Sequence, residues 1–277
     1  MSKNKYAVIG YPLGYSLSPL MHNHFFKKEG IDASYISLPI KTEDLKKMVD
    51  TGEYAGFNVT IPHKESILPY LTKVTEAAQT IGAVNTVKKT ATGYIGTNTD
   101  GDGFLLMLKH EKNLSLNDKN IVLYGAGGAA KAICYGAIKS GAKSLYIYDP
   151  DQQKVESLVS KSKYDLRYNI IRFLKDPQTM LPQTDIVINA TPIGMEKTIN
   201  ESVLNLSELK LLPKHAYVID IIYAPLQTQL LKLANSIGLQ TINGIGMLAG
   251  QGVLAEDYWF NKSLPYEEAK TLLLNGL

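Results

Sequence analysis

The sequence predicts an α/β protein of two domains. Short apolar, strand-like runs alternate with helix-like stretches along all 277 residues, a pattern typical of βαβ units with largely parallel sheets. A fresh βα series begins at Ile121, directly before a glycine-rich loop. The chain is long enough to bury two modest cores. We therefore expect an N-terminal α/β domain and a Rossmann-type, doubly wound domain, with a cleft between them.

Local signals place the elements of the first half. Ser18 as N-cap and Pro19 at the first position predict a helix that runs toward Gly30. Further helices are expected to open at Thr42, Pro62 and Thr75, the last of them ending at Gly82. Strands are predicted at residues 6–9, 35–38 and 57–61, and a hairpin is predicted from residues 84–87 and 94–95.

The second half repeats the alternation more regularly. Strands are predicted at residues 121–124, 144–148, 185–189, 217–222 and 241–242, and helices at 129–139 and 227–237. From Gly246 onward the sequence reads as helical. The expected domains are residues 1–102, with helices from 246–277 packing back on them, and residues 103–245.

The loop Gly125-Ala126-Gly127-Gly128-Ala129-Ala130 follows an apolar strand and opens a helix. Gly125 permits a tight turn, Gly127 lets the backbone approach a pyrophosphate, and Ala130 allows close helix–strand packing. The helix N-terminus presents free N–H groups and a positive dipole end to phosphates. A plain glycine-rich turn is the alternative, but strand, loop, helix and next strand agree. We expect a dinucleotide here, held by residues 125–129.

Asp149 ends the second strand of this series, where an acid accepts hydrogen bonds from the adenine ribose hydroxyls. A carboxylate there repels a 2′-phosphate, and residues 150–152 offer no arginine or lysine to neutralise one. Asp151 also reads as a helix N-cap, which is the structural alternative for this acidic pair. The stretch favours NAD, with NADP still possible.

Composition excludes several other classes of protein. The net charge of +3 is small and scattered, which argues against nucleic acid. The lone Cys134 cannot form an internal disulfide, and the five histidines show no metal-ligand spacing, so no metal is expected. Apolar runs are too short for a membrane span, and the first residues do not read as a signal peptide. We expect a cytoplasmic protein.

Four motifs before residue 105 place polar side chains at or just beyond the carboxyl end of a predicted strand, where ligand sites of open α/β sheets lie. They are residues 10–23 (GYPLGYSLSPLMHN), 57–64 (FNVTIPHK), 82–86 (GAVNT) and 96–103 (GTNTDGDG). Later motifs are residues 125–130 (GAGGAA), 189–195 (NATPIGM), 220–225 (DIIYAP) and 244–252 (GIGMLAGQG). In this order, over nearly the whole chain, they resemble the shikimate dehydrogenase family. The resemblance implies reversible, nicotinamide-dependent oxidation of shikimate to 3-dehydroshikimate.

Lys64 and Asp100 are the candidate catalytic residues. Lys64 lies just past a predicted strand, at the start of a helix whose positive dipole end disfavours the charged amine. A lysine beside a nicotinamide can give a proton to the carbonyl oxygen as hydride arrives, and take it back in oxidation. Asp100 would hold the lysine and share the hydrogen bond to the reacting hydroxyl. Alone, each would read as a surface lysine or a turn aspartate.

The resemblance also implies substrate-binding residues. Ser16 and Ser18 match the two serines that bind the substrate carboxylate, although Ser18 equally suits a helix N-cap. Thr60, Asn85 and Gln251 match residues that hydrogen-bond ring hydroxyls. Without a ligand-binding role, Asn85 would be a turn residue and Gln251 an ordinary helix residue.

Other residues are assigned to the cofactor side of the site. Tyr223, counted among the substrate-binding residues, would lie near the nicotinamide. Thr191, Gly244 and Met247 would frame the cofactor, although a methionine is more often a core residue.

Two positions depart from the family pattern. Tyr15 stands where a histidine usually precedes the first serine. Asp149-Pro150-Asp151 stands where biosynthetic members typically carry Asn-Arg-Thr, whose arginine clamps the 2′-phosphate of NADP. NAD-linked relatives include quinate/shikimate dehydrogenases that work oxidatively. The sequence therefore does not decide whether the physiological reaction is reduction or oxidation.

Three other functions remain as alternatives. A quinate-preferring enzyme needs room for an extra tertiary hydroxyl, which small serines at 16 and 18 would leave. A methylene-tetrahydrofolate dehydrogenase also pairs a lysine with a Rossmann domain, but gives no reason for the paired serines. A non-catalytic NAD sensor would not need both Lys64 and Asp100. The expected partners are shikimate, 3-dehydroshikimate or quinate, in a monomer or homodimer.

Overall fold

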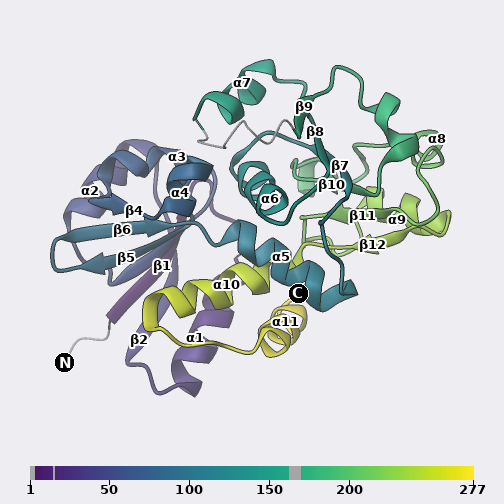
Figure 1. Cartoon of the computed structure of the whole chain (residues 1–277). Helices are drawn as coiled ribbons and strands as arrows, with labels where there is room; N and C mark the ends of the chain where they lie inside the picture. Colours follow the sequence, from purple (N-terminus) through teal and green to yellow (C-terminus); the bar gives the residue numbers. More distant parts are fainter. Residues whose placement is uncertain (1–3, 15, 162–169) are drawn as a thin grey trace. The chain divides into compact units, whose positions relative to one another are not determined.

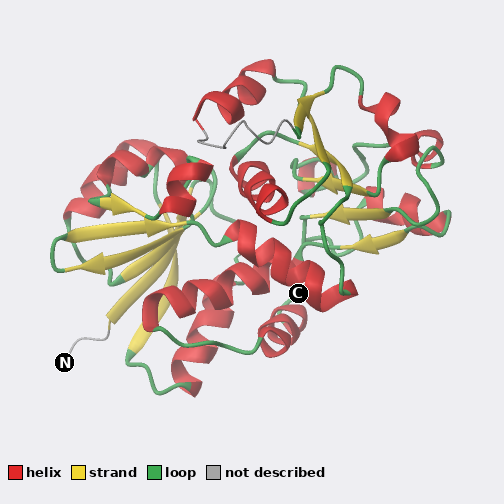
Figure 2. Ribbon diagram, viewed as in Figure 1, coloured by secondary structure: helices red, strands yellow, loops and turns green. Residues whose placement is uncertain are grey.

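The computed structural model describes residues 4–14, 16–161 and 170–277 (Figure 1). It divides into two compact units. The first unit comprises Met1–Gly103 and Ala249–Leu277, and the second comprises Phe104–Leu248. Each unit is built on a six-stranded sheet (Figure 2). The predicted architecture of two α/β domains is therefore confirmed.

The sheet of the first unit is mixed, with strand order β2-β1-β3-β5-β6-β4. Its strands are β1 (Asn4–Gly10), β2 (Ala33–Pro39), β3 (Gly56–Val59), β4 (Lys73–Val74), β5 (Thr86–Thr90) and β6 (Gly93–Thr97). β1 pairs in parallel with β2 and β3, whereas β5 is antiparallel to both β3 and β6. The hairpin predicted from two short runs is thus present, with β5 displaced toward the turn and β6 longer at both ends than the predicted run.

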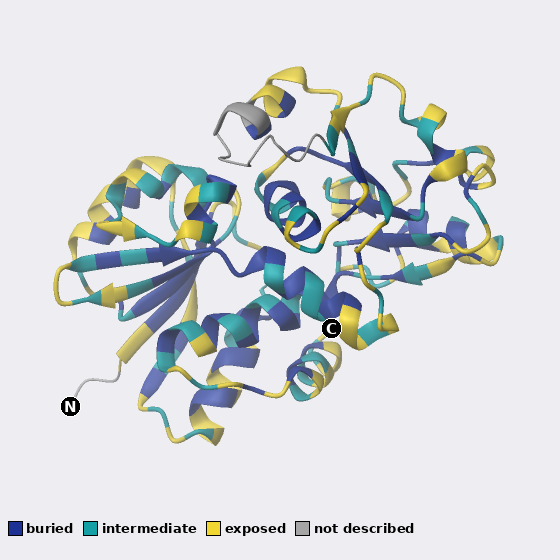
Figure 3. Ribbon diagram, viewed as in Figure 1, coloured by how far each residue is buried: buried dark blue, intermediate teal, exposed yellow. Residues whose placement is uncertain are grey.

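Alternation along β1 explains why helices cover both faces of this sheet. Tyr6 and Val8 pack with Phe26 and Trp259 on one face, and Ala7 and Ile9 pack on the other. Figure 3 shows the buried strands between more exposed helices. The helices are α1 (Ser18–Lys28), α2 (Leu45–Asp50), α3 (His63–Ser66), α4 (Glu76–Ile81), α5 (Asp100–Lys112), α10 (Ile245–Phe260) and α11 (Tyr266–Asn275), with 3-10 turns at Thr42–Asp44 and Leu68–Tyr70. The residues of α5 and of α10 belong partly to the first unit and partly to the second.

The sheet of the second unit is wholly parallel, with order β12-β11-β10-β7-β8-β9. Its strands are β7 (Asn120–Tyr124), β8 (Ser144–Tyr148), β9 (Ile171–Phe173), β10 (Ile186–Asn189), β11 (Tyr217–Asp220) and β12 (Gln240–Ile242). Its helices are α6 (Gly128–Lys139), α7 (Gln152–Lys161), α8 (Leu206–Leu209) and α9 (Gln229–Ser236), with 3-10 turns at Pro177–Gln183 and Glu196–Thr198. The order reverses between β7 and β10, so the loops after these strands flank the switch point where ligands of such sheets bind.

Alternation along β7 makes this unit doubly wound. Ile121 and Leu123 pack against Ile133 of α6, whereas Val122 and Tyr124 pack in a second cluster with Leu230 of α9. Both faces of the sheet are buried, as expected for parallel strands covered by helices on each side.

Local signals located most element ends to within a few residues. Thr75 caps α4, accepting from the Ala78 N–H, and Gly82 ends the helix with φ 71°. The start of α1 differs from the prediction, because Leu17 is the N-cap and Ser18 is already helical. Strands β4 and β9 were missed, since runs of two or three residues are too short to show a periodicity.

Two glycines allow α5 and α10 to cross closely in the first unit. A Cβ at Gly103 would lie 2.5 Å from the Gln251 backbone nitrogen, and one at Gly250 would lie 2.5 Å from the Gly103 carbonyl oxygen. Backbone atoms cannot rotate away as a side chain can. This crossing sets Asp100, at the start of α5, close to the segment of α10 that carries Gln251.

Replacing Gly103 with alanine is expected to destabilise the protein. Overpacking against backbone atoms costs about 3 kcal/mol, the upper end of the usual range, which exceeds the ~1 kcal/mol that alanine gains in helix propensity. Calorimetry should show Tm lower by roughly 2–8 °C. Gly14→Ala is the matched control, because a Cβ there meets nothing within 4 Å. Equal Tm values for the two variants would contradict the close crossing.

Candidate active site

Lys64 and Asp100 are joined by an ion pair in the first unit. Lys64 lies in the short helix α3 directly after β3, and Asp100 is the first residue of α5. The Lys64 Nζ lies 2.5 Å from the Asp100 Oδ2, with 15% and 7% of the two side chains exposed. The structure therefore brings together two groups that stand 36 residues apart in the chain.

Asn85 holds the other oxygen of the same carboxylate. Its Nδ2 donates to Asp100 Oδ1 at 2.7 Å, and its Oδ1 accepts from the Thr99 N–H at 2.8 Å. Thr86 Oγ1 also donates to the Asn85 amide oxygen, at 2.9 Å. Asn85 is 2% exposed, so its orientation is set by these bonds and not by solvent.

A chain of buried polar side chains connects Asn85 to Tyr35. No functional role for these side chains was predicted from the sequence. Asn58 donates to Thr86 Oγ1 at 3.0 Å and to the Asn85 carbonyl at 3.2 Å. The Tyr35 hydroxyl donates to Asn58 Oδ1 at 2.6 Å. The available signal was an asparagine within an otherwise apolar strand, because such a residue needs buried partners.

The two serines lie at the N-terminus of α1. Ser16 Oγ accepts from the Ser18 N–H at 3.3 Å, so its hydroxyl serves the first turn of this helix. Ser18 is buried. Burial, and then the nearby Glu256 carboxylate, raise the pKa of Tyr35 well above its usual 10.0, while the contact with Ser18 opposes the rise. Tyr15 lies outside the described residues.

Thr60 and Gln251 complete the predicted substrate set in this unit. A Cβ on Gly10 would lie 2.6 Å from Thr60 Cγ2, so the glycine at the end of β1 makes room for the threonine after β3. The Thr99 hydroxyl donates to the Gln251 carbonyl at 3.0 Å, which ties α10 to the residue before Asp100.

The glycine-rich loop of the second unit has the backbone that an anion site requires. Gly125 has φ +105°, and a Cβ there would lie 2.8 Å from the Ala190 carbonyl oxygen. Gly127 is the N-cap of α6 and supplies no side chain to the first amides of this 12-residue helix. Those amides and the helix dipole suit a diphosphate. The donor set therefore fits a dinucleotide.

Asp149 supports this loop directly. Its Oδ2 accepts from the Ala126 N–H at 3.0 Å, and its Oδ1 accepts from the Asp151 N–H at 2.9 Å. A carboxylate has about four acceptor sites, so both oxygens keep capacity for ribose hydroxyls. The nearby Lys154 Nζ lies 3.8 Å from the Asp151 carboxylate.

Asp220 ties together the loops that follow β10 and β11. It accepts from the Asn189 side chain at 3.1 Å, the Ile222 N–H at 3.1 Å and the Thr228 hydroxyl at 2.7 Å. Burial raises the pKa of this carboxyl, and these three bonds oppose the rise. Asn189 in turn accepts from the Thr191 N–H and hydroxyl.

The remaining cofactor candidates differ in character. Burial raises the pKa of Tyr223. A Cβ on Gly244 would lie 1.9 Å from the Ile221 carbonyl oxygen, so only glycine fits there. Met247 is 7% exposed and packs within the hydrophobic core of the second unit. The structure therefore gives it a packing role.

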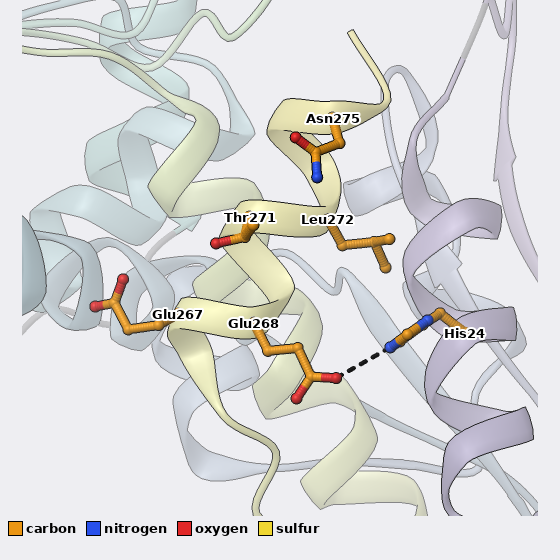
Figure 4. Close-up of a pocket in the computed structure, with 6 residues that line it drawn as sticks. All are labelled: His24, Glu267, Glu268, Thr271, Leu272 and Asn275. Carbon is orange, nitrogen blue, oxygen red and sulfur yellow. Dashed lines mark hydrogen bonds and ion pairs between the residues drawn. The ribbon is translucent and has the colours of Figure 1, made fainter.

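A surface pocket elsewhere in the first unit lacks this chemistry. It has a volume of about 370 Å³ and lies between α1 and α11 (Figure 4). His24 lies 3.0 Å from Glu268, which Lys28 also pairs. Exposed ion pairs of this kind contribute little and leave no group positioned for reaction.

Residues 4–14, 16–161 and 170–277 contain neither a candidate metal cluster nor a candidate membrane span. No three of the His, Cys, Asp and Glu side chains in that part of the chain are grouped so as to hold a metal ion. Within the same residues, every helix is too short or too polar to cross a membrane.

Both halves of the chain match family models. Residues 8–87 match the shikimate dehydrogenase substrate binding domain, and residues 107–228 match shikimate / quinate 5-dehydrogenase. The shikimate dehydrogenase (NADP+) of Microcystis aeruginosa is 38% identical over 275 residues, which cover 96% of this chain and 95% of that protein.

Solved structures agree over the whole chain. The shikimate 5-dehydrogenase of Listeria monocytogenes, in complex with shikimate and NAD, is 33% identical with a TM-score of 0.84, covering 98% of this chain and 96% of that one. The enzyme of Thermus thermophilus, in complex with NADP(H) and shikimate, is 29% identical with a TM-score of 0.87, covering 99% and 100%. With the buried lysine–aspartate pair and the glycine-rich loop, these matches show that the chain belongs to the shikimate dehydrogenase family and is an oxidoreductase.

Proposed function

We propose that this protein interconverts shikimate and 3-dehydroshikimate and favours NAD as the hydride carrier. The observation that carries the proposal is the buried Lys64–Asp100 ion pair, oriented by Asn85. The Asp149 carboxylate beside the phosphate loop supports the choice of cofactor. The substrate-binding role falls to the first unit and the dinucleotide-binding role to the second.

Proton transfer is the task of this chain's own residues. A nicotinamide dinucleotide, held by the glycine-rich loop of the second unit, would supply the hydride chemistry at the carbon that carries the reacting hydroxyl. In oxidation the Lys64 amine takes the hydroxyl proton, and in reduction the Lys64 ammonium gives a proton to the carbonyl oxygen. Asp100 fixes the position of Nζ and stabilises the ammonium form, while Asn85 keeps the carboxylate from rotating.

Recognition of the ring is assigned to neutral polar groups. Ser16 and Ser18 would bind the carboxylate at the N-terminus of α1, where the helix dipole favours an anion. Thr60, Asn85 and Gln251 would bind the ring hydroxyls, and Tyr223 would lie near the nicotinamide. A site of this kind rejects deoxy analogues, because buried donors and acceptors would be left unpaired.

Two observations support NAD. Asp149 places negative charge where the 2′-phosphate of NADP would lie, and Pro150 stands where an arginine would be needed to bind that phosphate. The Listeria monocytogenes relative was solved with NAD, although the Microcystis aeruginosa relative is named for NADP+. Thr191, Gly244 and residues 125–129 would contact either cofactor.

Quinate is the second candidate substrate, since the family model of residues 107–228 covers both activities. Its tertiary hydroxyl would lie beside the carboxylate, next to Ser16 and Ser18. Initial rates with each acid and each cofactor separate the two candidates.

Lys64→Ala is expected to lower kcat by about 10²–10⁴, because a positioned acid–base group contributes that much. KM for shikimate should change far less. Initial rates of shikimate-dependent NAD reduction provide the measurement.

Lys89→Ala is the matched lysine control, since Lys89 is exposed and its ammonium group donates to the Gly52 carbonyl. It should retain wild-type kinetics. A Lys64→Ala enzyme as active as this control would refute the catalytic role, and NAD binding without turnover of any cyclohexane acid would indicate a sensor.

The wild-type enzyme is expected to show a higher kcat/KM with NAD than with NADP. Pro150→Arg should raise kcat/KM for NADP by about 10–100-fold, the effect of one charge-assisted contact with a phosphate, and leave NAD kinetics nearly unchanged. Pro150→Ala controls for loss of the proline. A wild-type preference for NADP would overturn the assignment.

A further inference from the structure

A second buried ion pair lies in the first unit, apart from the proposed chemistry. His22 Nδ1 of α1 lies 2.6 Å from Glu256 Oε1 of α10, and the two side chains are 0% and 1% exposed. The other ring nitrogen of His22, Nε2, is buried and has no hydrogen-bond partner. Such a pair is costly, because two ionisable groups lose water and one nitrogen stays unsatisfied.

Stability alone gives no reason for this arrangement. Apolar side chains of similar size often replace a buried ion pair without loss of stability. The surroundings are suited to them, since Tyr6, Phe26 and Trp259 form the apolar cluster between the sheet and these helices. A role of the pair in positioning α1 and α10 would explain why it is buried here.

On the α1 side, the pair is connected to the proposed carboxylate site. His22 lies four residues after Ser18, on the same face of the helix. Its ring stacks on Tyr35, with 4.3 Å between centroids and 20° between planes. The Tyr35 hydroxyl donates to Asn58 Oδ1 at 2.6 Å, which fixes the ring on which His22 stacks.

On the α10 side, Glu256 lies five residues after Gln251, whose carbonyl accepts from Thr99. The helix that carries the proposed hydroxyl ligand is thus bonded to Thr99, beside Asp100, and to His22 on α1. The His22–Glu256 pair joins the helix of Ser18 to the helix of Gln251.

We propose that His22 and Glu256 are positioning residues for substrate recognition, which hold α1 and α10 at the separation that one shikimate molecule spans. The inference rests on the proposed function. It predicts that loss of the pair raises KM for shikimate, while kcat and KM for the cofactor change little, because Lys64, Asp100 and the phosphate loop are held by other contacts.

The test is the double variant His22→Phe, Glu256→Leu, which removes both charges and keeps an apolar, filled core. KM for shikimate is expected to rise by about tenfold, equivalent to one misaligned hydrogen bond to the substrate. KM for NAD and kcat should stay within about twofold, since neither depends on this pair. An unchanged KM for shikimate would overturn the proposal.

Glu256→Gln is the conservative variant, because its amide oxygen can still accept from His22 Nδ1–H. This variant should keep KM for shikimate within about threefold of the wild-type value, since the hydrogen bond between His22 and residue 256 remains without the carboxylate charge. A KM as high as that of the double variant would show that spacing is not the cause.

Tyr94→Phe is the structural control. The Tyr94 hydroxyl donates to the Tyr54 carbonyl at 2.7 Å, in the core at the hairpin end of β6. It should lower Tm without changing KM. If the double variant behaves in the same way, the ion pair is a stability element only.

A measurement on the wild type guards against a double variant that does not fold. The ring-nitrogen NMR shifts of His22, assigned with Glu256→Gln, should move on saturation with shikimate and stay fixed on saturation with NAD. Fixed shifts in both titrations would overturn the proposal. Absence of shikimate turnover in the wild type would instead refute the proposed function.

Discussion

Both oxygens of the Asp100 carboxylate are held, one by Lys64 and one by Asn85, where only 7% of the side chain is exposed. A carboxylate in that position without partners would be costly, so the pair and the asparagine depend on one another. The rest of the first unit supplies this support. Thr99 and Thr86 orient Asn85, and the glycine crossing of α5 and α10 brings Gln251 near the start of the same helix.

Much of this arrangement was predictable, because the motif residues stand at strand ends. Lys64 and Asp100 follow β3 and β6 by a few residues. These two strands flank β5 and both run antiparallel to it, so their carboxyl ends lie at the same edge of the sheet. The asparagine within β3 indicated a buried polar contact, but the identity of its partners, Tyr35 and Thr86, was not predictable, because they are distant in sequence. The pairing of His22 with Glu256, 234 residues apart, likewise depends on how two helices pack.

The two units solve the problem of buried polar groups in the same way. In the first, an asparagine orients the aspartate that pairs with the proposed catalytic lysine. In the second, Asn189 and Asp220 join neighbouring loops, and Thr228 completes the set. Each network joins several buried groups by hydrogen bonds, so each is expected to fix one conformation of its loops and leave little freedom for alternatives.

Asp149 supports the phosphate loop and is also the proposed ligand of the ribose, and these two roles constrain how an enzyme of this kind could change its cofactor. The same carboxylate that would meet the ribose also receives the Ala126 N–H of the phosphate loop. Discarding the acid first would loosen the diphosphate cradle before any affinity for a phosphorylated ribose had been gained. Under the proposed preference for NAD, adaptation to NADP would therefore begin at the residues that follow Asp149, and mutations that add positive charge there would precede loss of the acid.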